Sequence, residues 1–217
     1  MYSWRRDERQ TARNAFPVIR DKRVLLNVGR IDPIKNQHWL VEQTPRIFRK
    51  YPNTLLVLVG ACTNEAYGIA LQRRIAELNL GHRILLTGGL PPNDPCLIGL
   101  FQEAEALLLP SLSETFGLVI LEAWATDTMV LSSRTSGAAS LLRNGQNGWF
   151  FDLDQPETFH RALDQTLSRP DLAKRLVGCG AEEVSRDYSL AVIAGRMKQL
   201  YEDLIQEKKA HALRNHS

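Results

Sequence analysis

Residues 106–126 read Ala-Leu-Leu-Leu-Pro-Ser-Leu-Ser-Glu-Thr-Phe-Gly-Leu-Val-Ile-Leu-Glu-Ala-Trp-Ala-Thr. The apolar run up to Leu109 has the length of a buried strand and stops at a proline, whereas the residues from Gly117 onward carry apolar side chains at helical intervals. The stretch therefore predicts a strand, a loop and a helix in direct succession. It holds two carboxylates, Glu114 in the loop and Glu122 five residues into the helix, about 7.5 Å along its axis.

The predicted helix start has the features of an anion site. Gly117 allows close approach, and backbone N–H groups around Phe116, Gly117 and Leu118 point out of the helix start, where the macrodipole also attracts a phosphate. Two carboxylates would repel a bare phosphate, but they accept hydrogen bonds from vicinal hydroxyls. The pattern favours a phosphate flanked by sugars. For the pair taken alone, a capped helix with an exposed glutamate is the alternative.

A second cluster lies in residues 24–36, which read Val-Leu-Leu-Asn-Val-Gly-Arg-Ile-Asp-Pro-Ile-Lys-Asn. A buried strand is expected to end at Gly29, and two cations, Arg30 and Lys35, follow it in a loop. The guanidinium is a planar fork and the ammonium a point charge, a pairing that suits a diphosphate. Two solvated cations on a surface loop are the alternative if this cluster stands alone.

Strands and helices are expected to alternate along the chain. The strands are predicted near 24–28, 54–59, 83–88, 106–109, 129–133 and 149–151. The helices are predicted at 37–50, 64–79, 95–104, 117–126 and 137–143, and from residue 156 in three or four pieces to about 207. This order predicts an α/β fold, a Rossmann-like doubly wound parallel sheet of about six strands with helices on both faces. Such sheets bind ligands at the carboxyl ends of their strands, where both clusters and Leu90 are expected.

The two motifs together, Gly29-Arg30-x4-Lys35 and Glu114-x-Phe-Gly-x4-Glu122, resemble family 4 of the retaining glycosyltransferases. The resemblance runs from about Arg5 to about Ile205 and is to the C-terminal, nucleotide-sugar donor-binding domain of their GT-B architecture. It implies transfer of a hexose from a UDP-, GDP- or ADP-linked sugar to an acceptor hydroxyl, with retention of configuration. It implies neither a metal nor another cofactor.

The resemblance also implies a role for each matching residue. Arg30 and Lys35 would hold the diphosphate and, with Glu114 beside the transferred sugar, are the catalytic candidates. Glu122 would bind the ribose hydroxyls, and Leu90 would contact the base. The donor-binding candidates are Gly29, Arg30, Lys35, Leu90, Glu114, Thr115, Phe116, Gly117, Leu118 and Glu122.

Three positions depart from regular expectations. The family usually has a glycine at the end of the helix that carries Glu122, where this chain has Asp127, so Asp127 is expected to adopt the left-handed geometry. The usual Gly-Gly-x-x-Glu segment appears as Ser136-Gly-Ala-Ala-Ser140, which removes a carboxylate from the donor-sugar side. Pro45 is expected to kink the helix over 37–50. In addition, Asp154 is expected to cap the helix that follows it.

Other chemistries lack their signatures. No G-x-G-x-x-G follows Gly29 and no P-loop motif occurs, which argues against a dehydrogenase or an ATPase. The five histidines are dispersed, and the three cysteines have neither disulfide-framework nor zinc-site spacing, so no metal site is predicted.

We expect one nucleotide-sugar-binding domain over 1–217, with a basic linker helix at 1–20 and a C-terminal helix at 190–209. The N-terminal acceptor domain of the family is absent from these 217 residues, so the isolated chain is expected to be inactive. The alternative is a stand-alone nucleotide-sugar-binding or regulatory module without catalysis.

The net charge is +3, and the composition is that of a globular protein with 44% hydrophobic and 24% charged residues. No apolar run is long enough to span a membrane and the polar start lacks a secretory signal, so we expect a cytoplasmic protein. The basic N-terminal segment has no nucleic-acid recognition motif. Peripheral contact with an anionic membrane is the weaker reading beside a solvated linker.

Overall fold

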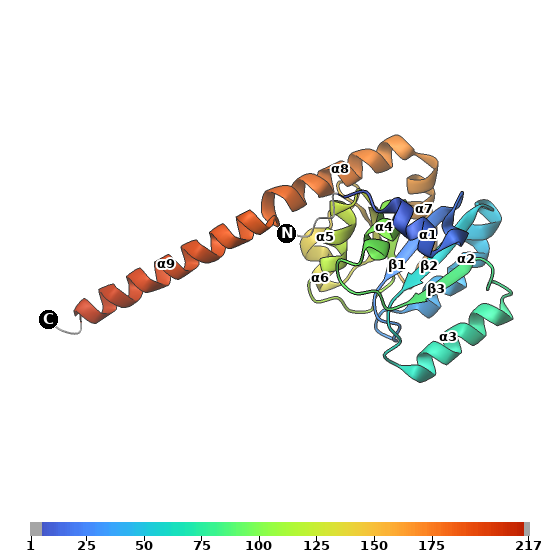
Figure 1. Cartoon of the computed structure of the whole chain (residues 1–217), viewed down its shortest axis with the longest axis horizontal. Helices are drawn as coiled ribbons and strands as arrows, with labels where there is room; N and C mark the ends of the chain where they lie inside the picture. The colour runs from blue at the N-terminus through green and yellow to red at the C-terminus, as the bar shows by residue number, and fades with distance from the viewer. Residues whose placement is uncertain (1–5, 215–217) are drawn as a thin grey trace. The chain divides into compact units, whose positions relative to one another are not determined.

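The computed structural model describes residues 6–214. The described residues fall into two compact units, residues 6–181 and residues 182–214. The first unit contains the sheet, and the second consists of helix (Figure 1).

The first unit is built on a six-stranded sheet in which every neighbouring pair is parallel. Its strands are β1 (Arg23–Val28), β2 (Thr54–Val59), β3 (Ile84–Gly88), β4 (Ala104–Leu109), β5 (Met129–Ser133) and β6 (Trp149–Phe151). They lie in the order β3-β2-β1-β4-β5-β6. The order reverses between β1 and β4, as in a doubly wound sheet, which confirms the predicted fold class.

Helices connect the strands close to where the sequence predicts them. They are α1 (Arg9–Ala15), α2 (Gln37–Lys50), α3 (Glu65–Glu77), α4 (Pro95–Glu103), α5 (Leu118–Ala125), α6 (Ser136–Leu141), α7 (Pro156–Ser168), α8 (Pro170–Asp187) and α9 (Leu190–Arg214). Helix α9 extends beyond residue 209, where the C-terminal helix was expected to end. No helix among residues 6–214 combines the length and the apolar character needed to cross a bilayer.

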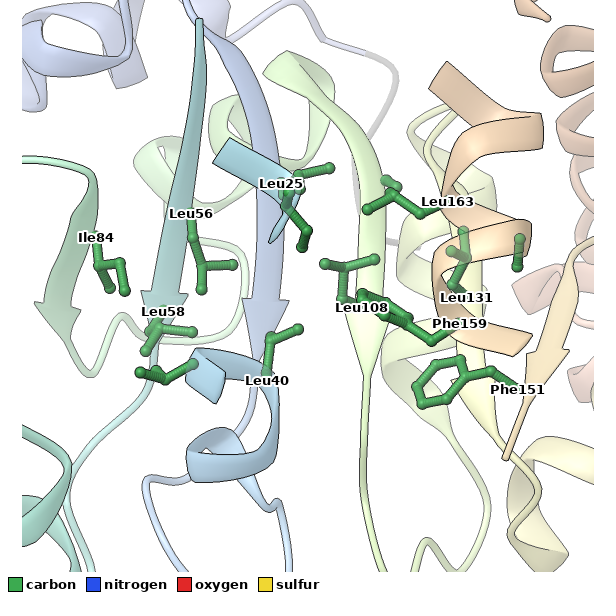
Figure 2. Packing of buried hydrophobic residues seen from close by; sticks show 14 of the residues in the cluster. Leu25, Leu40, Leu56, Leu58, Ile84, Leu108, Leu131, Phe151, Phe159 and Leu163 are labelled. Carbon is green, nitrogen blue, oxygen red and sulfur yellow. The ribbon is translucent and has the colours of Figure 1, made fainter. Parts of the chain in front are cut away.

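The core on one face of the sheet is shown in Figure 2. Leu40 of α2 and Phe159 and Leu163 of α7 pack over strand residues that include Leu25 and Leu108. Helices α4 and α5 also contact the sheet, but their buried residues lie outside this cluster. Alternate strand residues face opposite sides, so α4 and α5 cover the second face. The helices on both faces agree with the sequence.

The N-terminal segment differs from the expected linker helix at 1–20. Within the described residues it forms α1, which ends at Ala15, and a separate 3-10 turn (Pro17–Ile19). Proline has no N–H to continue the helix, which explains the break. Helix α1 packs on α4: Ala12 is fully buried, and Arg13 pairs with Glu103 at 3.0 Å. This segment is therefore part of the packed unit; residues 1–5 lie outside the described residues.

Helix α2 passes through Pro45 without ending or restarting. Proline cannot donate to the carbonyl four residues earlier, that of Val41. The Thr44 hydroxyl donates to this carbonyl instead, at 2.7 Å. The side chain of Thr44 thus supplies the hydrogen bond that Pro45 removes, and the helix keeps its full length.

Two predicted helix ends have different outcomes. Asp127 has a φ of 58°, so it does adopt the left-handed geometry expected after α5. Asp154 does not cap α7, because the N-cap is Gln155. The prediction was wrong because the helix begins one residue later than a cap at Asp154 requires, with Pro156 as its first residue and no side-chain cap found within the described residues. The Thr158 hydroxyl instead ties the preceding segment to α7 by accepting from the Asp152 N–H at 2.8 Å.

His160 makes the stability of the fold depend on pH. Burial, and secondarily the nearby Arg46, hold the pKa of this imidazole below its usual range. Its Nε2 lies 3.1 Å from Oε1 of Gln43, as a neutral donor would. Because the folded chain favours the neutral ring, the contribution of His160 to the free energy of unfolding is fully present above the unfolded pKa, near 6.5. It is lost as the pH falls below that value, by at most about 1.4 kcal/mol per pH unit.

We therefore expect the free energy of unfolding of the wild type, from urea titrations, to decrease between about pH 7 and pH 5. His160→Gln should flatten this dependence, whereas replacement of the exposed His82 should leave it as in the wild type. An equally steep dependence in His160→Gln would assign it to another group.

Candidate functional site

The candidate site lies where the order of the sheet reverses. Strands β1 and β4 are neighbours, and the loops that leave their carboxyl ends are hydrogen-bonded to each other. The Leu112 N–H donates to the Ile34 carbonyl at 2.8 Å, and the Asn36 amide donates to the Pro110 carbonyl at 3.2 Å. The two predicted motifs therefore lie together at the carboxyl edge of the sheet, which we call the rim.

Lys35 and Glu114 are in direct contact on this rim. The Lys35 Nζ lies 2.5 Å from Oε2 of Glu114, and the two side chains are 19% and 18% exposed. The methylene stem of Lys35 runs past Gly29, where a Cβ would lie 3.3 Å from its Cδ. The structure thus joins a cation of the first motif to an acid of the second, 79 positions apart.

Arg30 is held by a residue that the sequence analysis did not select. Its Nη2 lies 3.2 Å from Oδ2 of Asp32, whose side chain is only 8% exposed, while the Arg30 side chain is 59% exposed. The signal for Asp32 was present, because an acid before a proline with a lysine three positions on is typical of a tight turn. Arg30 and Lys35 thus belong to one short turn after β1.

The start of α5 follows Glu114 directly. Gly117 is the N-cap, with φ 86° and ψ 42°, a conformation that glycine adopts without strain. Within the described residues no side chain caps this helix start. Thr115, Phe116 and Leu118 are exposed around it. This end of α5 therefore offers its positive dipole end on the same rim as Glu114.

The loop that carries Glu114 is fixed from the other side by α6. The Gly137 N–H and the Ser136 hydroxyl both donate to the Glu114 carbonyl, at 2.8 and 3.2 Å. Ser140, which stands where the resembled family has a glutamate, turns its hydroxyl back to the Gly137 carbonyl at 2.7 Å. The Ser140 hydroxyl is thus hydrogen-bonded within α6, and Ser140 brings no charge to this side of the rim.

Glu122 is half-buried on α5. Burial raises the pKa of its carboxyl group, and no hydrogen bond or ion pair to this carboxyl group is found in the described part of the chain. An ionised carboxylate without a partner is costly in such surroundings. The Glu122 carboxyl group is therefore able to accept hydrogen bonds from a ligand.

Glu122→Gln is expected to raise the free energy of unfolding at pH 7 by about 1 kcal/mol, because it removes a desolvated charge. The gain should shrink toward about pH 4, where the glutamate is itself neutral. Urea titrations at both pH values test this, with the exposed Glu182→Gln on α8 as control. A loss of stability at pH 7 would show that the carboxylate has a stabilising partner.

Leu90 follows β3 at the same edge of the sheet but is separate from the other candidates. Strand β3 lies three positions from β4, about 14 Å at the usual strand spacing. The sheet thus places Leu90 at the far end of the rim from Glu114.

Two cavities lie away from this rim. One of about 660 Å³ opens at the amino ends of β1, β4 and β5, and one of about 430 Å³ lies between α2 and α7. Neither is lined by any of the ten candidate residues. Parallel sheets bind ligands at the opposite, carboxyl edge, so we give the rim more weight than either cavity. Among residues 6–214 no cluster of three or more potential metal ligands is found.

Comparisons with known proteins identify glycosyltransferases as relatives of this chain. The D-inositol 3-phosphate glycosyltransferase of Corynebacterium urealyticum is 27% identical over 199 residues, which cover 90% of this chain and 46% of that protein. The chain thus spans about half the length of the curated relatives it matches.

Solved structures show the same fold. Anabaena HepE in complex with UDP and glucose has a TM-score of 0.80 at 19% identity, over 90% of this chain and 52% of that one. The C-terminal domain of a group 1 glycosyl transferase, LpcC from Francisella tularensis, has a TM-score of 0.72 at 19% identity and covers 84% of this chain and 93% of that one.

The family described as "Glycosyl transferases group 1" matches residues 8–182, which include β1, β4, both loops of the rim and α5. The chain therefore belongs to the group 1 glycosyl transferases, with a fold that forms one half of the GT-B architecture.

Proposed function

We propose that this chain is the donor-binding half of a retaining glycosyltransferase that moves a hexose from a nucleoside-diphosphate sugar to an acceptor hydroxyl. The observation that carries the proposal is the 2.5 Å contact between Lys35 and Glu114. It brings the cation expected at the diphosphate and the carboxylate expected at the sugar to the same place. Arg30, from the same turn as Lys35, adds a second positive charge.

In the proposed reaction the bond between the anomeric carbon and the diphosphate oxygen breaks, and a bond to the acceptor oxygen forms on the same face of the sugar. The proton of the acceptor hydroxyl passes to the departing diphosphate. Negative charge builds on the leaving diphosphate, where Arg30, Lys35 and the start of α5 at Gly117 would stabilise it. No metal is needed for this step in our proposal. Glu114 would orient the sugar and stabilise positive character at its anomeric carbon.

The other candidates complete the donor site. The backbone from Thr115 to Leu118, with Gly29, would line the phosphates and the sugar. Glu122 would accept hydrogen bonds from the ribose hydroxyls, which would satisfy its unpartnered carboxylate. Leu90, at the far end of the rim, would contact the base.

UDP-glucose is the first donor to test. Anabaena HepE, which shares the fold, is described in complexes with UDP and with UDP-glucose. The name of the Corynebacterium relative, D-inositol 3-phosphate glycosyltransferase, supports an acceptor that carries hydroxyl groups. Because the curated relatives are about twice as long, we propose that acceptor binding needs a further domain. Three free cysteines within the described residues are compatible with a location in the cytoplasm.

The proposal is tested by thermal unfolding in the presence of UDP, GDP, ADP and their glucose and mannose conjugates. A ligand at 100 times its dissociation constant stabilises a folded chain by about 2.7 kcal/mol. We expect the nucleotides of one base to stabilise the chain selectively, and the nucleosides, which lack phosphate, to stabilise it much less. A response to none of the nucleotides at millimolar concentration would contradict the proposal.

A stand-alone nucleotide-sugar-binding or regulatory module is the second candidate, because such a module would need only this donor site. The release of UDP from UDP-glucose by a protein that joins this chain to an acceptor-binding domain, followed with and without acceptor sugars, separates the two functions. A transferase releases UDP in proportion to the acceptor product, whereas a binding module holds the donor unchanged.

A further inference from the structure

Asp32 is the buried charge at the centre of the turn after β1. It is only 6% exposed. Its carboxylate has three partners: Nη2 of Arg30 at 3.2 Å, the N–H of Lys35 at 3.0 Å and the hydroxyl of Thr63 at 3.4 Å. One side chain therefore contacts both residues expected at the diphosphate.

The backbone around Asp32 is equally constrained. Its carbonyl accepts from the N–H groups of Lys35 and Asn36, at 3.2 and 3.3 Å. The preceding residue, Ile31, is hydrogen-bonded to the segment after β2 through its N–H and its carbonyl, at 2.9 and 3.3 Å. Asp32 is thus a fixed point against which an exposed side chain can be oriented.

Arg30 is the exposed side chain that Asp32 contacts, with 59% of its surface accessible. Within the described residues, the only hydrogen bond or ion pair of its guanidinium is the one from Nη2 to Asp32. A guanidinium has five N–H donors in a planar fork, so the remaining donors can face a ligand. Holding one corner of the fork reduces the rotamer freedom that binding would otherwise remove.

We propose that Asp32 is a positioning residue that holds the Arg30 fork toward the diphosphate of the donor, and that it also shapes the turn from which Lys35 extends. This inference rests on the proposed function. Removing the Asp32 charge is expected to change diphosphate affinity in the direction opposite to that predicted by simple electrostatics. A carboxylate beside a diphosphate would by itself repel it, so that removing its charge would tighten binding. A positioning role predicts weaker binding instead.

The test is isothermal titration of Asp32→Asn with UDP, GDP and ADP and with the corresponding nucleosides. Asparagine can still accept from the Lys35 N–H but cannot form the ion pair with Arg30. We expect the affinity for the preferred nucleoside diphosphate to fall by about tenfold. The affinity for the matching nucleoside should stay within about twofold, because it has no phosphate for Arg30 to hold.

A double-mutant cycle shows whether Asp32 acts through Arg30. In an Arg30→Met background, Asp32→Asn should change the affinity by less than about twofold. Glu105→Gln is the matched control, since Glu105 pairs with Arg23 through two bonds of 2.7 Å at the opposite edge of the sheet. This control should leave nucleotide affinity unchanged.

The outcomes separate the inference from the proposed function. Unchanged or tighter binding in Asp32→Asn, or an equal loss in the Arg30→Met background, overturns the positioning role alone. The absence of binding of all three diphosphates to the wild type overturns the proposed function and this inference with it. If Asp32→Asn does not fold, Thr63→Val removes one anchor of the same carboxylate, and unchanged affinity there contradicts the role.

Discussion

Replacing Lys35 with methionine is expected to lower the affinity for UDP by about 100-fold, which corresponds to one charge-assisted hydrogen bond of roughly 3 kcal/mol. Methionine keeps an unbranched apolar stem that can lie over Gly29, so the change is confined to the ammonium group. Its loss removes a cation from the diphosphate and also leaves Glu114, which is only 18% exposed, without its partner. The unpaired carboxylate then faces the incoming phosphates.

This second effect makes the prediction specific. In the Lys35→Met background, Glu114→Gln should recover UDP affinity by about fivefold, because it removes the unpaired carboxylate. In the wild type the same change should alter UDP affinity by less than about threefold. Calorimetric titration of the four proteins measures the coupling.

The chain offers a matched control for Lys35. Lys50 forms a comparable pair with Asp164, at 2.6 Å, on helices away from the rim. Lys50→Met should bind UDP like the wild type. If Lys35→Met also binds UDP with unchanged affinity, Lys35 does not hold the diphosphate, and the contact with Glu114 is only structural.

The sequence predicted the sheet well because its signals are local. β2 is a continuous run of buried residues, Thr54–Val59, that is apolar from Leu55 onward, and each predicted strand lies within two residues of an observed one. The meeting of Lys35 with Glu114 was also predictable. The shared edge follows from the rule that parallel strands bind ligands at their carboxyl ends, whereas the direct contact depends on β1 and β4 being neighbours in the sheet.

The details that the sequence did not predict depend on partners distant in the chain. The packing of α1 on α4 rests on contacts such as Arg13 with Glu103, which no local pattern indicates. The role of Asp32 depends on Thr63, a residue of the segment after β2. At Pro45 the sequence indicated the loss of a backbone hydrogen bond, but the hydroxyl of the neighbouring Thr44 supplies the missing donor. Tertiary contacts therefore decided the first two cases, and a side-chain hydrogen bond within the helix decided the third.

Gly60→Ala is expected to destabilise the fold by about 3 kcal/mol, because the site leaves no room for a methyl group. A Cβ at Gly60 would lie 1.9 Å from the carbonyl oxygen of Gly29 and 2.7 Å from its carbonyl carbon. Both atoms belong to the backbone, which cannot turn aside as a side chain can. The Gly60 N–H also donates to the Gly88 carbonyl at 2.9 Å, so the residue is held between the ends of β1 and β3.

Relief of this contact must move the backbone at Gly29, directly before Arg30, or the end of β2. We therefore expect Gly60→Ala to lose UDP affinity in addition to stability, by urea titration and calorimetry under conditions where the variant is folded. Gly178→Ala is the control, because a Cβ there meets no atom within 4 Å and the residue lies within α8. Alanine should stabilise that helix by about 0.8 kcal/mol. A stable Gly60→Ala with unchanged UDP affinity would show that the end of β2 can shift without disturbing the turn that carries Arg30 and Lys35.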